Sequence, residues 1–233
     1  VSRTPDPADG RSARLALTEA GREGFETLNN ATVDRWSRML SALSADQRAD
    51  VTAAMALVRG VLDPTLERTA RAASVRLRDP VPGDLGWVVE RHAVLYGREY
   101  GWGPLFEGVV ADMAGQLVRA LQGPGAKGWI AELDGRRVGC VFLVPEQEAP
   151  GVARLRLLLL EPEARGLKLG QRLTDECLAF ARAWGYREVV LWTHTVLTAA
   201  RAIYASRGFV LEESHWHDDF GPSIESETWR LVF

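Results

Sequence analysis

The chain has 233 residues, a net charge of −3, and the hydrophobic (46%) and charged (25%) fractions of an ordinary globular protein. This length is too great for one small domain and suits one and a half or two. The charge balance excludes a basic footprint for nucleic acid along the whole chain, and no apolar run reaches the roughly 20 residues that span a bilayer. Without a recognisable signal peptide, we expect a cytoplasmic protein in which Cys140 and Cys177 are buried and reduced.

The first 73 residues predict a strand pair followed by two helices and a linker. Turn-forming residues between positions 5 and 10 divide residues 1–17 into two strands. Thr18 is a suitable N-cap for a long helix to about residue 43. Ser44 and Gln47 form a capping box for a second helix to about residue 62, and residues 64–73 are expected to be a linker.

From residue 74 onward the hydrophobic pattern alternates between strands and helices. We expect strands near 74–78, 128–133, 137–144, 153–160, 187–193, 208–214 and 226–232, and helices near 84–98, 104–122, 168–184 and 197–207. An antiparallel front half followed by a strand–helix–strand crossover predicts an α/β or α+β sandwich.

The segment from Glu161 to Gly170, which reads Glu-Pro-Glu-Ala-Arg-Gly-Leu-Lys-Leu-Gly, follows an apolar strand and opens a helix. The free N–H groups of a helix N-terminus form an anion site, which suits the pyrophosphate of a nucleotide-like cofactor, although an ordinary strand–turn–helix has the same pattern. The segment resembles the acyl-CoA-binding motif of GNAT N-acetyltransferases, Arg/Gln-x-x-Gly-x-Gly/Ala. The resemblance implies a cofactor-binding role for Arg165, Gly166, Leu167, Lys168, Leu169 and Gly170.

Lys168 stands where that family most often has its middle glycine. A glycine lets a phosphate approach the backbone closely. We expect the lysine to fit with a negative φ and to add a positive charge near the pyrophosphate. Binding of CoA would then be retained with altered geometry.

A second segment, Ala200 to Phe209, resembles the family pattern Ala-x-x-x-Tyr-x-x-x-Gly-Phe. The resemblance implies that Tyr204 lies beside the CoA sulfur and protonates the departing thiolate. Without this resemblance, Tyr204 would be interpreted as an ordinary half-buried helix tyrosine. The resemblance also implies that the backbone at Leu158 and Leu160 holds the pantetheine arm and polarises the thioester carbonyl. The family often has an Asn that contacts the cofactor where this chain has Leu197, so a side-chain amide is missing at that position.

The acceptor side of such a site needs a general base and a pocket. Candidate bases are His92, Glu99 and His194. The family resemblance places the acceptor pocket at Tyr96, Tyr100 and Trp102, although an aromatic stripe at helical spacing also suits a core. The segment 215–221 holds two His and two Asp; a loop beside the substrate is favoured there over a metal site, so no metal is expected.

The segment from Arg3 to Arg22 resembles the wing and the following helix of MarR-type winged-helix regulators. The resemblance implies that Arg11 contacts DNA, oriented by Asp9, and that the two following helices form a homodimer. The helix-turn-helix that reads the major groove would have to precede Val1, so DNA is expected as a partner only where that segment is present. Proteins that join a MarR-type regulator to a GNAT domain have this order.

Together these patterns predict a partial MarR-type segment over 1–63, a linker over 64–73 and a GNAT domain, with its mixed central sheet flanked by helices, over 74–233. The predicted function is acetyl-CoA-dependent transfer to a small primary amine, such as an amino acid or related metabolite, without a membrane partner. A domain that senses CoA or a ligand without turnover is the alternative, and Lys168 and Leu197 favour it. A DNA-binding protein is the third hypothesis.

Overall fold

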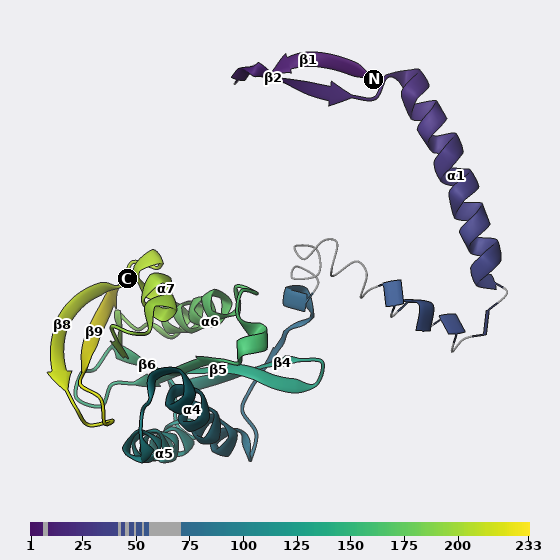
Figure 1. Ribbon diagram of the computed structural model, residues 1–233. Coiled ribbons are helices and arrows are strands. Elements are labelled where there is room, and N and C mark those ends of the chain that lie inside the picture. Colours follow the sequence, from purple (N-terminus) through teal and green to yellow (C-terminus); the bar gives the residue numbers. More distant parts are fainter. Residues whose placement is uncertain (7–8, 42, 45–46, 49, 53, 56–70) are drawn as a thin grey trace. The chain divides into compact units, whose positions relative to one another are not determined.

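The computed structural model of the chain describes residues 1–6, 9–41, 43–44, 47–48, 50–52, 54–55 and 71–233 (Figure 1). The chain divides into two compact units, Val1–Pro64 and Thr65–Phe233, called here the N-terminal and C-terminal units. The side chains of Asp9 and Arg11 lie outside the described part, so their predicted contact with DNA stays a prediction. None of the described helices is long and apolar enough to cross a membrane.

The N-terminal unit begins with the predicted strand pair. Strands β1 (Ser2–Asp6) and β2 (Asp9–Ala16) are antiparallel, and helix α1 (Glu19–Ser41) follows. The backbone N–H of Gly21 donates to Thr18 Oγ1 at 3.2 Å, which confirms the predicted N-cap. Reciprocal hydrogen bonds of 3.0 and 3.2 Å between Ser44 and Gln47 confirm the capping box. The predicted second helix is helical as far as residue 55 where it is described, and its remainder lies outside the described residues.

Helix α1 carries an apolar face that the described part of this unit does not cover. No residue of α1 is buried, and Phe25, Leu28, Trp36 and Met39 are each at least half exposed. Their spacing places them on one side of the helix.

The C-terminal unit is built on a seven-stranded mixed sheet in the order β3-β4-β5-β6-β7-β9-β8. Only the β6–β7 pair is parallel, as the predicted crossover requires. The strands are β3 (Arg76–Arg78), β4 (Lys127–Leu133), β5 (Arg136–Pro145), β6 (Val152–Leu160), β7 (Glu188–His194), β8 (Val210–His217) and β9 (Ile224–Val232). Residues 71–74 are helical, whereas residues 71–73 were predicted to be part of a linker. Arginine and alanine at 71–73 are strong helix formers and account for the difference.

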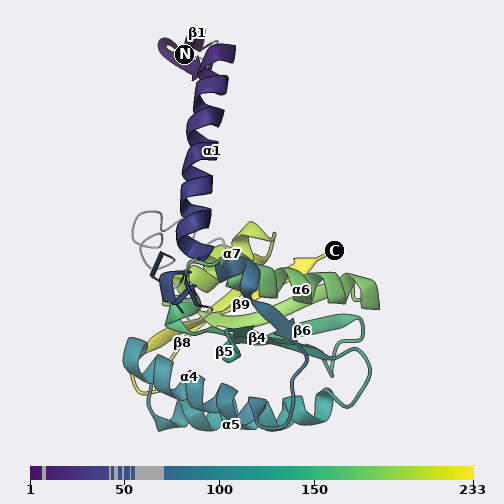
Figure 2. The same ribbon diagram turned by 90° about the vertical axis from the view of Figure 1, so that its right-hand side faces the viewer.

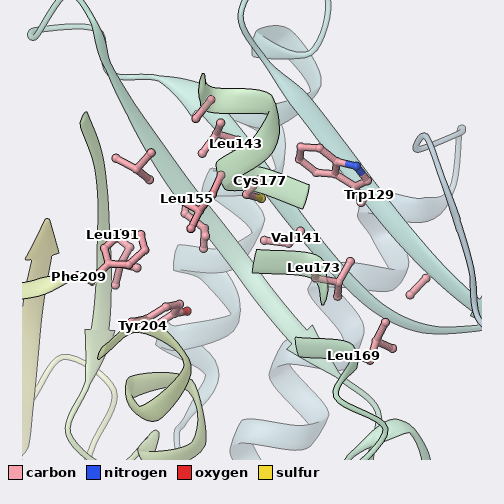
Figure 3. Close-up of a cluster of buried hydrophobic side chains, with 14 of the residues drawn as sticks. Trp129, Val141, Leu143, Leu155, Leu169, Leu173, Cys177, Leu191, Tyr204 and Phe209 are labelled. Carbon is pink, nitrogen blue, oxygen red and sulfur yellow. The ribbon is translucent and has the colours of Figure 1, made fainter. Parts of the chain in front are cut away.

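Helices cover both faces of this sheet. Helices α4 (Asp84–Tyr100) and α5 (Pro104–Ala120) lie on one face, and α6 (Leu169–Trp184) and α7 (Thr198–Ser206) lie on the other (Figures 1 and 2). The apolar cluster under α6 and α7 includes Leu155, Leu173, Leu191 and Tyr204, and the ring of Tyr204 lies near that of Phe209 (Figure 3). A second cluster packs under α4 and α5, so each face of the sheet has its own core.

The two parallel strands separate before they end. Pairing of β6 with β7 runs from Val152 opposite Glu188 to Leu155 opposite Leu191 and stops there. Beyond that point β6 remains paired with β5 alone, through a register irregularity where Leu157 adopts a φ of +53°. The backbone groups of residues 156–160 that face β7 are consequently left free of sheet partners, which is the condition for the predicted backbone contacts of Leu158 and Leu160 with a ligand.

Candidate active site

Two adjoining hollows occupy the region where β6 and β7 separate. The first, called here the strand-end groove, is lined by Leu95, Leu158, Leu160, Arg165, Gly170 and Ile203. The second, called the aromatic pocket, is lined by His92, Trp102, Phe106, Trp192, His194 and Tyr204. Tyr96, Leu158, Leu197 and Ala200 border both, so the two hollows lie side by side. Sequence-predicted residues from α4, β6, α6 and α7 therefore meet at one place.

The turn that leads into α6 has the backbone of a glycine-rich loop. Gly166 has a φ of +79°, and a Cβ there would meet no atom within 4 Å. Lys168 is the N-cap of α6 with a φ of +57° and an exposed side chain. The expectation of a negative φ at Lys168 is wrong, because the turn keeps the left-handed conformation that the family's glycine adopts freely. An exposed turn at a helix N-terminus suits the binding of a phosphate group, because the free backbone N–H groups there favour an anion.

The remaining residues of this turn contribute in different ways. The side chains of Leu167 and Leu169 are buried in the core, so only their backbone is available to a ligand. A Cβ on Gly170 would lie 2.9 Å from Ile203 Cδ1, so the glycine permits the close approach of α6 to α7. The start of the turn is held by Arg91, which donates to the carboxylate of buried Glu161 at 2.6 and 2.9 Å. The turn from Glu161 to Gly170 is thus held in place at both ends.

Arg165 is already paired within the protein. Its guanidinium donates to Glu99 Oε1 at 2.7 Å, which links the turn to the end of α4. One residue predicted to bind the cofactor and one predicted as a general base are therefore in direct contact. Their separation of 66 positions hides this contact from local sequence patterns.

Tyr204 comes from α7 and is 4% exposed. Burial raises the pKa of its phenol well above the usual value of 10, so the hydroxyl is protonated at neutral pH. Its hydroxyl has no hydrogen-bond partner among the described residues, and the side chain borders the aromatic pocket. A protonated, unpaired phenol beside a pocket is able to donate a proton there.

Two of the candidate bases are buried histidines that line the aromatic pocket. Burial lowers the pKa of both His92 and His194 to about 4, so each is neutral at pH 7. His92 Nδ1 lies 2.8 Å from the carbonyl oxygen of Val88, which fixes the proton on Nδ1 because a carbonyl only accepts. His194 Nε2 lies 3.2 Å from His217 Nε2.

His217 is a functional candidate that the sequence prediction did not single out. It belongs to β8, and its Nδ1 lies 3.1 Å from Asp219 Oδ2, an ion-pair distance without hydrogen-bond alignment. His194, His217 and exposed Asp219 thus form a row leading out of the pocket. The sequence pointed only to the whole segment 215–221, with its two His and two Asp, as a loop beside the substrate; the structure places residues 215–217 in strand β8 instead.

The predicted acceptor aromatics divide between the two hollows. Trp102 and Tyr96 border the aromatic pocket, and the Trp102 ring lies 4.7 Å from that of His194. Tyr100 borders the strand-end groove beside Glu99. Trp102 also belongs to an apolar cluster with Phe106 and Phe220, so it serves as core and as pocket wall. Arg154 and Arg156 of β6 line the aromatic pocket too, and the sequence prediction missed both.

No group of three or more His, Cys, Asp or Glu side chains that could hold a metal ion occurs among the described residues. Cys140 and Cys177 are both free and buried, as predicted.

Comparisons with known proteins identify the family of the chain. The sequence model of the acetyltransferase (GNAT) family matches residues 95–209. An uncharacterised N-acetyltransferase of Schizosaccharomyces pombe is 31% identical over 123 residues, which cover 53% of this chain and 75% of that protein. The chain belongs to the GNAT acetyltransferase family. As a GNAT enzyme it is an N-acetyltransferase with acetyl-CoA as donor, which confirms the predicted enzyme class.

Other GNAT relatives share only part of their length with the chain. N-acetyltransferase 8B of Rattus norvegicus is 34% identical over 124 residues, and the chain spans 52% of that protein. A GNAT superfamily phosphinothricin acetyltransferase of Sinorhizobium meliloti, solved in complex with AcCoA, has a TM-score of 0.57 and 20% identity, covering 69% of this chain and 89% of that one. At that identity the structural similarity shows the GNAT fold alone.

Proposed function

We propose that this enzyme transfers the acetyl group of acetyl-CoA directly to a small-molecule primary amine while both are bound. The observation that carries the proposal is that the strand-end groove and the aromatic pocket lie side by side at the separated ends of β6 and β7 and share four lining residues. A donor in the groove and an acceptor in the pocket would meet there, which gives the proximity that direct transfer needs.

The donor is held by the groove and by the turn before α6. Arg165 and the backbone from Gly166 to Gly170 take the pyrophosphate, because the open left-handed turn and the helix N-terminus both favour an anion. The free backbone at Leu158 and Leu160 takes the pantetheine arm and polarises the carbonyl. The bound donor supplies the thioester that the amine attacks.

His194 is our candidate for the general base. The acceptor amine arrives as an ammonium ion, and neutral His194 in the pocket wall accepts its proton before attack while releasing its own to His217, so that a charged His194, which its low pKa disfavours, does not accumulate. His217, 3.2 Å away, accepts the displaced proton and passes it toward Asp219 and solvent. Glu99 is the second candidate, and its bond to Arg165 would have to open for that role.

Tyr204 is our candidate for the general acid. As the C–S bond of the thioester breaks, the Tyr204 hydroxyl gives its proton to the CoA sulfur. Its place in the wall of the aromatic pocket and its protonated state support the role.

Two measurements test the proposed function. Calorimetry with acetyl-CoA is expected to show binding, and no detectable heat at millimolar ligand would overturn the proposal. Free thiol release in the presence of a panel of amines then separates an enzyme from a CoA-sensing domain, for which acetyl-CoA would bind without turnover.

For the N-terminal unit we propose the wing and dimerisation helices of a MarR-type regulator. The strand pair followed by a long helix supports this order, and the uncovered apolar face of α1 fits a second copy of the chain. Light scattering is expected to report a dimer, and Leu28→Glu together with Trp36→Glu a monomer; an unchanged mass would contradict the dimer. DNA binding depends on an upstream helix-turn-helix and is tested by a gel shift with a form that carries one.

A further inference from the structure

Strand β6 carries two charged residues in an otherwise apolar run. Its sequence is Val-Ala-Arg-Leu-Arg-Leu-Leu-Leu-Leu, and both arginines, Arg154 and Arg156, border the aromatic pocket. Placing arginine beside a half-enclosed apolar pocket is unfavourable unless something compensates the charge. The two arginines differ in whether the protein supplies that compensation.

Arg154 has an ion-pair partner, whereas Arg156 has no direct partner and interacts only through space with the charge of Glu146. Arg154 forms a short ion pair with Glu146 of the loop after β5. Arg156 is half-buried, and among the described residues it has neither an ion-pair nor a hydrogen-bond partner. Burial, followed by the repulsion of Arg154, lowers the pKa of the Arg156 guanidinium from its ordinary value. The guanidinium is still charged at neutral pH, and its five donors remain available.

Trp102, which lines the same pocket, carries a second unused donor. Its side chain is 5% exposed, and its Nε1 is buried without a hydrogen-bond partner. Buried polar groups are nearly always paired, so such an exception calls for a partner that the protein alone does not provide. Trp102 stands on the loop between α4 and α5, independently of Arg156 on β6.

The pocket wall also lacks any negative charge. No Asp or Glu is among the described residues that line it, whereas two arginines are. A simple amine arriving as an ammonium ion would meet repulsion there and no counter-charge. A zwitterion would bring its own carboxylate to the arginine and remove that repulsion.

We propose that the acceptor is a primary amine that also carries a carboxylate, as an α-amino acid does. Arg156 binds the carboxylate, the Trp102 N–H adds a second hydrogen bond, and Phe106, Val110, Met113 and Trp192 contact an apolar side chain. The proposal rests on the transferase function proposed above and names the chemical class of its acceptor. Guanidinium and carboxylate suit each other geometrically, because both are planar and able to form two parallel hydrogen bonds.

Matched pairs of acceptors test this proposal, each pair differing only in the carboxylate. Suitable pairs are phenylalanine with 2-phenylethylamine, leucine with 3-methylbutylamine, and methionine with 3-(methylthio)propylamine. Thiol release is measured for the wild type, Arg156→Gln, Arg156→Lys and Trp102→Phe. Arg136→Gln is the matched control, because Arg136 is an arginine whose side chain is 80% exposed.

In the wild type, at least one amino acid should exceed its decarboxylated partner in kcat/KM by about 10- to 100-fold, the range expected for hydrogen bonds to a charged group. Arg156→Gln should remove that preference by raising the KM for the amino acid, and it should lower rather than raise the KM for the decarboxylated amine, because it relieves the repulsion of the ammonium ion. Arg156→Lys should retain part of the preference. Trp102→Phe keeps a ring in the pocket and should weaken the amino acid alone, and Arg136→Gln should match the wild type.

The outcomes separate this proposal from the transferase function itself. Equal rates for both members of every pair, unaffected by Arg156→Gln, would overturn the carboxylate site while leaving the transferase intact. If no amine releases thiol, calorimetry with the same amino acids decides: binding that is lost in Arg156→Gln supports the site and refutes only turnover. Absence of both binding and turnover with every amino acid refutes the site. If Arg156→Gln does not fold, Arg156→Lys and Trp102→Phe carry the same comparison.

Discussion

Replacing Lys168 with glycine should stabilise the C-terminal unit. Lys168 caps α6 with a φ of +57° and a ψ of 14°. This left-handed conformation costs a residue with a side chain roughly 1–2 kcal/mol, and it costs glycine almost nothing. Glycine gains chain entropy in the unfolded state, which offsets about 0.4–1 kcal/mol of that benefit. We therefore expect Lys168→Gly to raise the free energy of unfolding by about 0.5–1 kcal/mol.

Urea and thermal unfolding of the full chain, followed by circular dichroism, measure this gain. For a unit of this size about 1 kcal/mol corresponds to roughly 2–4 °C in Tm, so a shift of about 1–4 °C is expected. Lys168→Ala is the matched control: it removes the same ammonium group but keeps a Cβ in the left-handed region. If Lys168→Gly and Lys168→Ala have the same Tm, the strain ascribed to the turn is refuted.

The same pair of variants, Lys168→Gly and Lys168→Ala, separates the effect of backbone strain on stability from the effect of the lysine charge on acetyl-CoA binding. Both lose the positive charge at the N-terminus of α6, and we expect the KM for acetyl-CoA to rise about two- to fivefold in each, since such exposed charges contribute about 0.3–1 kcal/mol. Added salt should narrow the difference in KM between each variant and the wild type, because the Lys168 side chain is exposed and its charge is screened.

Three further predictions concern the site. Tyr204→Phe keeps the ring and removes the proton, so kcat should fall about 100-fold or more with little change in acetyl-CoA affinity, and an unchanged kcat would remove its role as acid. His92 has its pKa lowered by burial from 6.5 to about 4, so the stability it contributes is complete above pH 6.5 and is lost as pH falls toward 4; His92→Gln should flatten the pH dependence of unfolding by up to about 3 kcal/mol over that window, and an identical slope in both proteins would contradict the burial of a neutral ring. Glu99→Gln weakens the pair with Arg165 and should lower the KM for acetyl-CoA while kcat stays within about threefold, whereas a loss of kcat above about 100-fold would make Glu99 the base.

The sequence predicted the elements of the C-terminal unit closely because their signals are local. The helix expected near 168–184 is Leu169–Trp184, and the strand expected near 153–160 is Val152–Leu160. Hydrophobic periodicity and turn residues determine such segments over a few positions. The predicted N-caps at Thr18 and Ser44 depend on contacts three residues apart and were confirmed for the same reason.

What the sequence could not supply were contacts set by sheet register and strand irregularity. His194 meets His217 across 23 positions because β7 and β8 both pair with β9, and periodicity carries no such information. Arg156 borders the pocket beside a register irregularity at Leu157, whose positive φ is unusual for leucine. The conformation of Lys168 was predicted wrongly, because the residue type disfavours the φ that the turn between two buried leucines requires.

The two departures from the family pattern change side chains and leave the backbone of the site in place. Lys168 has a left-handed φ, a conformation open to glycine, so the lysine adds a side chain and a charge to a turn whose backbone a glycine could also form. Leu197 caps α7 through its backbone, donating to the carbonyl of His194 at 2.9 Å and accepting from the N–H of Arg201 at 3.0 Å. The start of α7 therefore needs no side-chain amide at this position, and Tyr204 is carried to the pocket regardless. Since neither substitution displaces a group proposed to move a proton, they are weak grounds for a domain that senses CoA without turnover, and the arrangement favours catalysis.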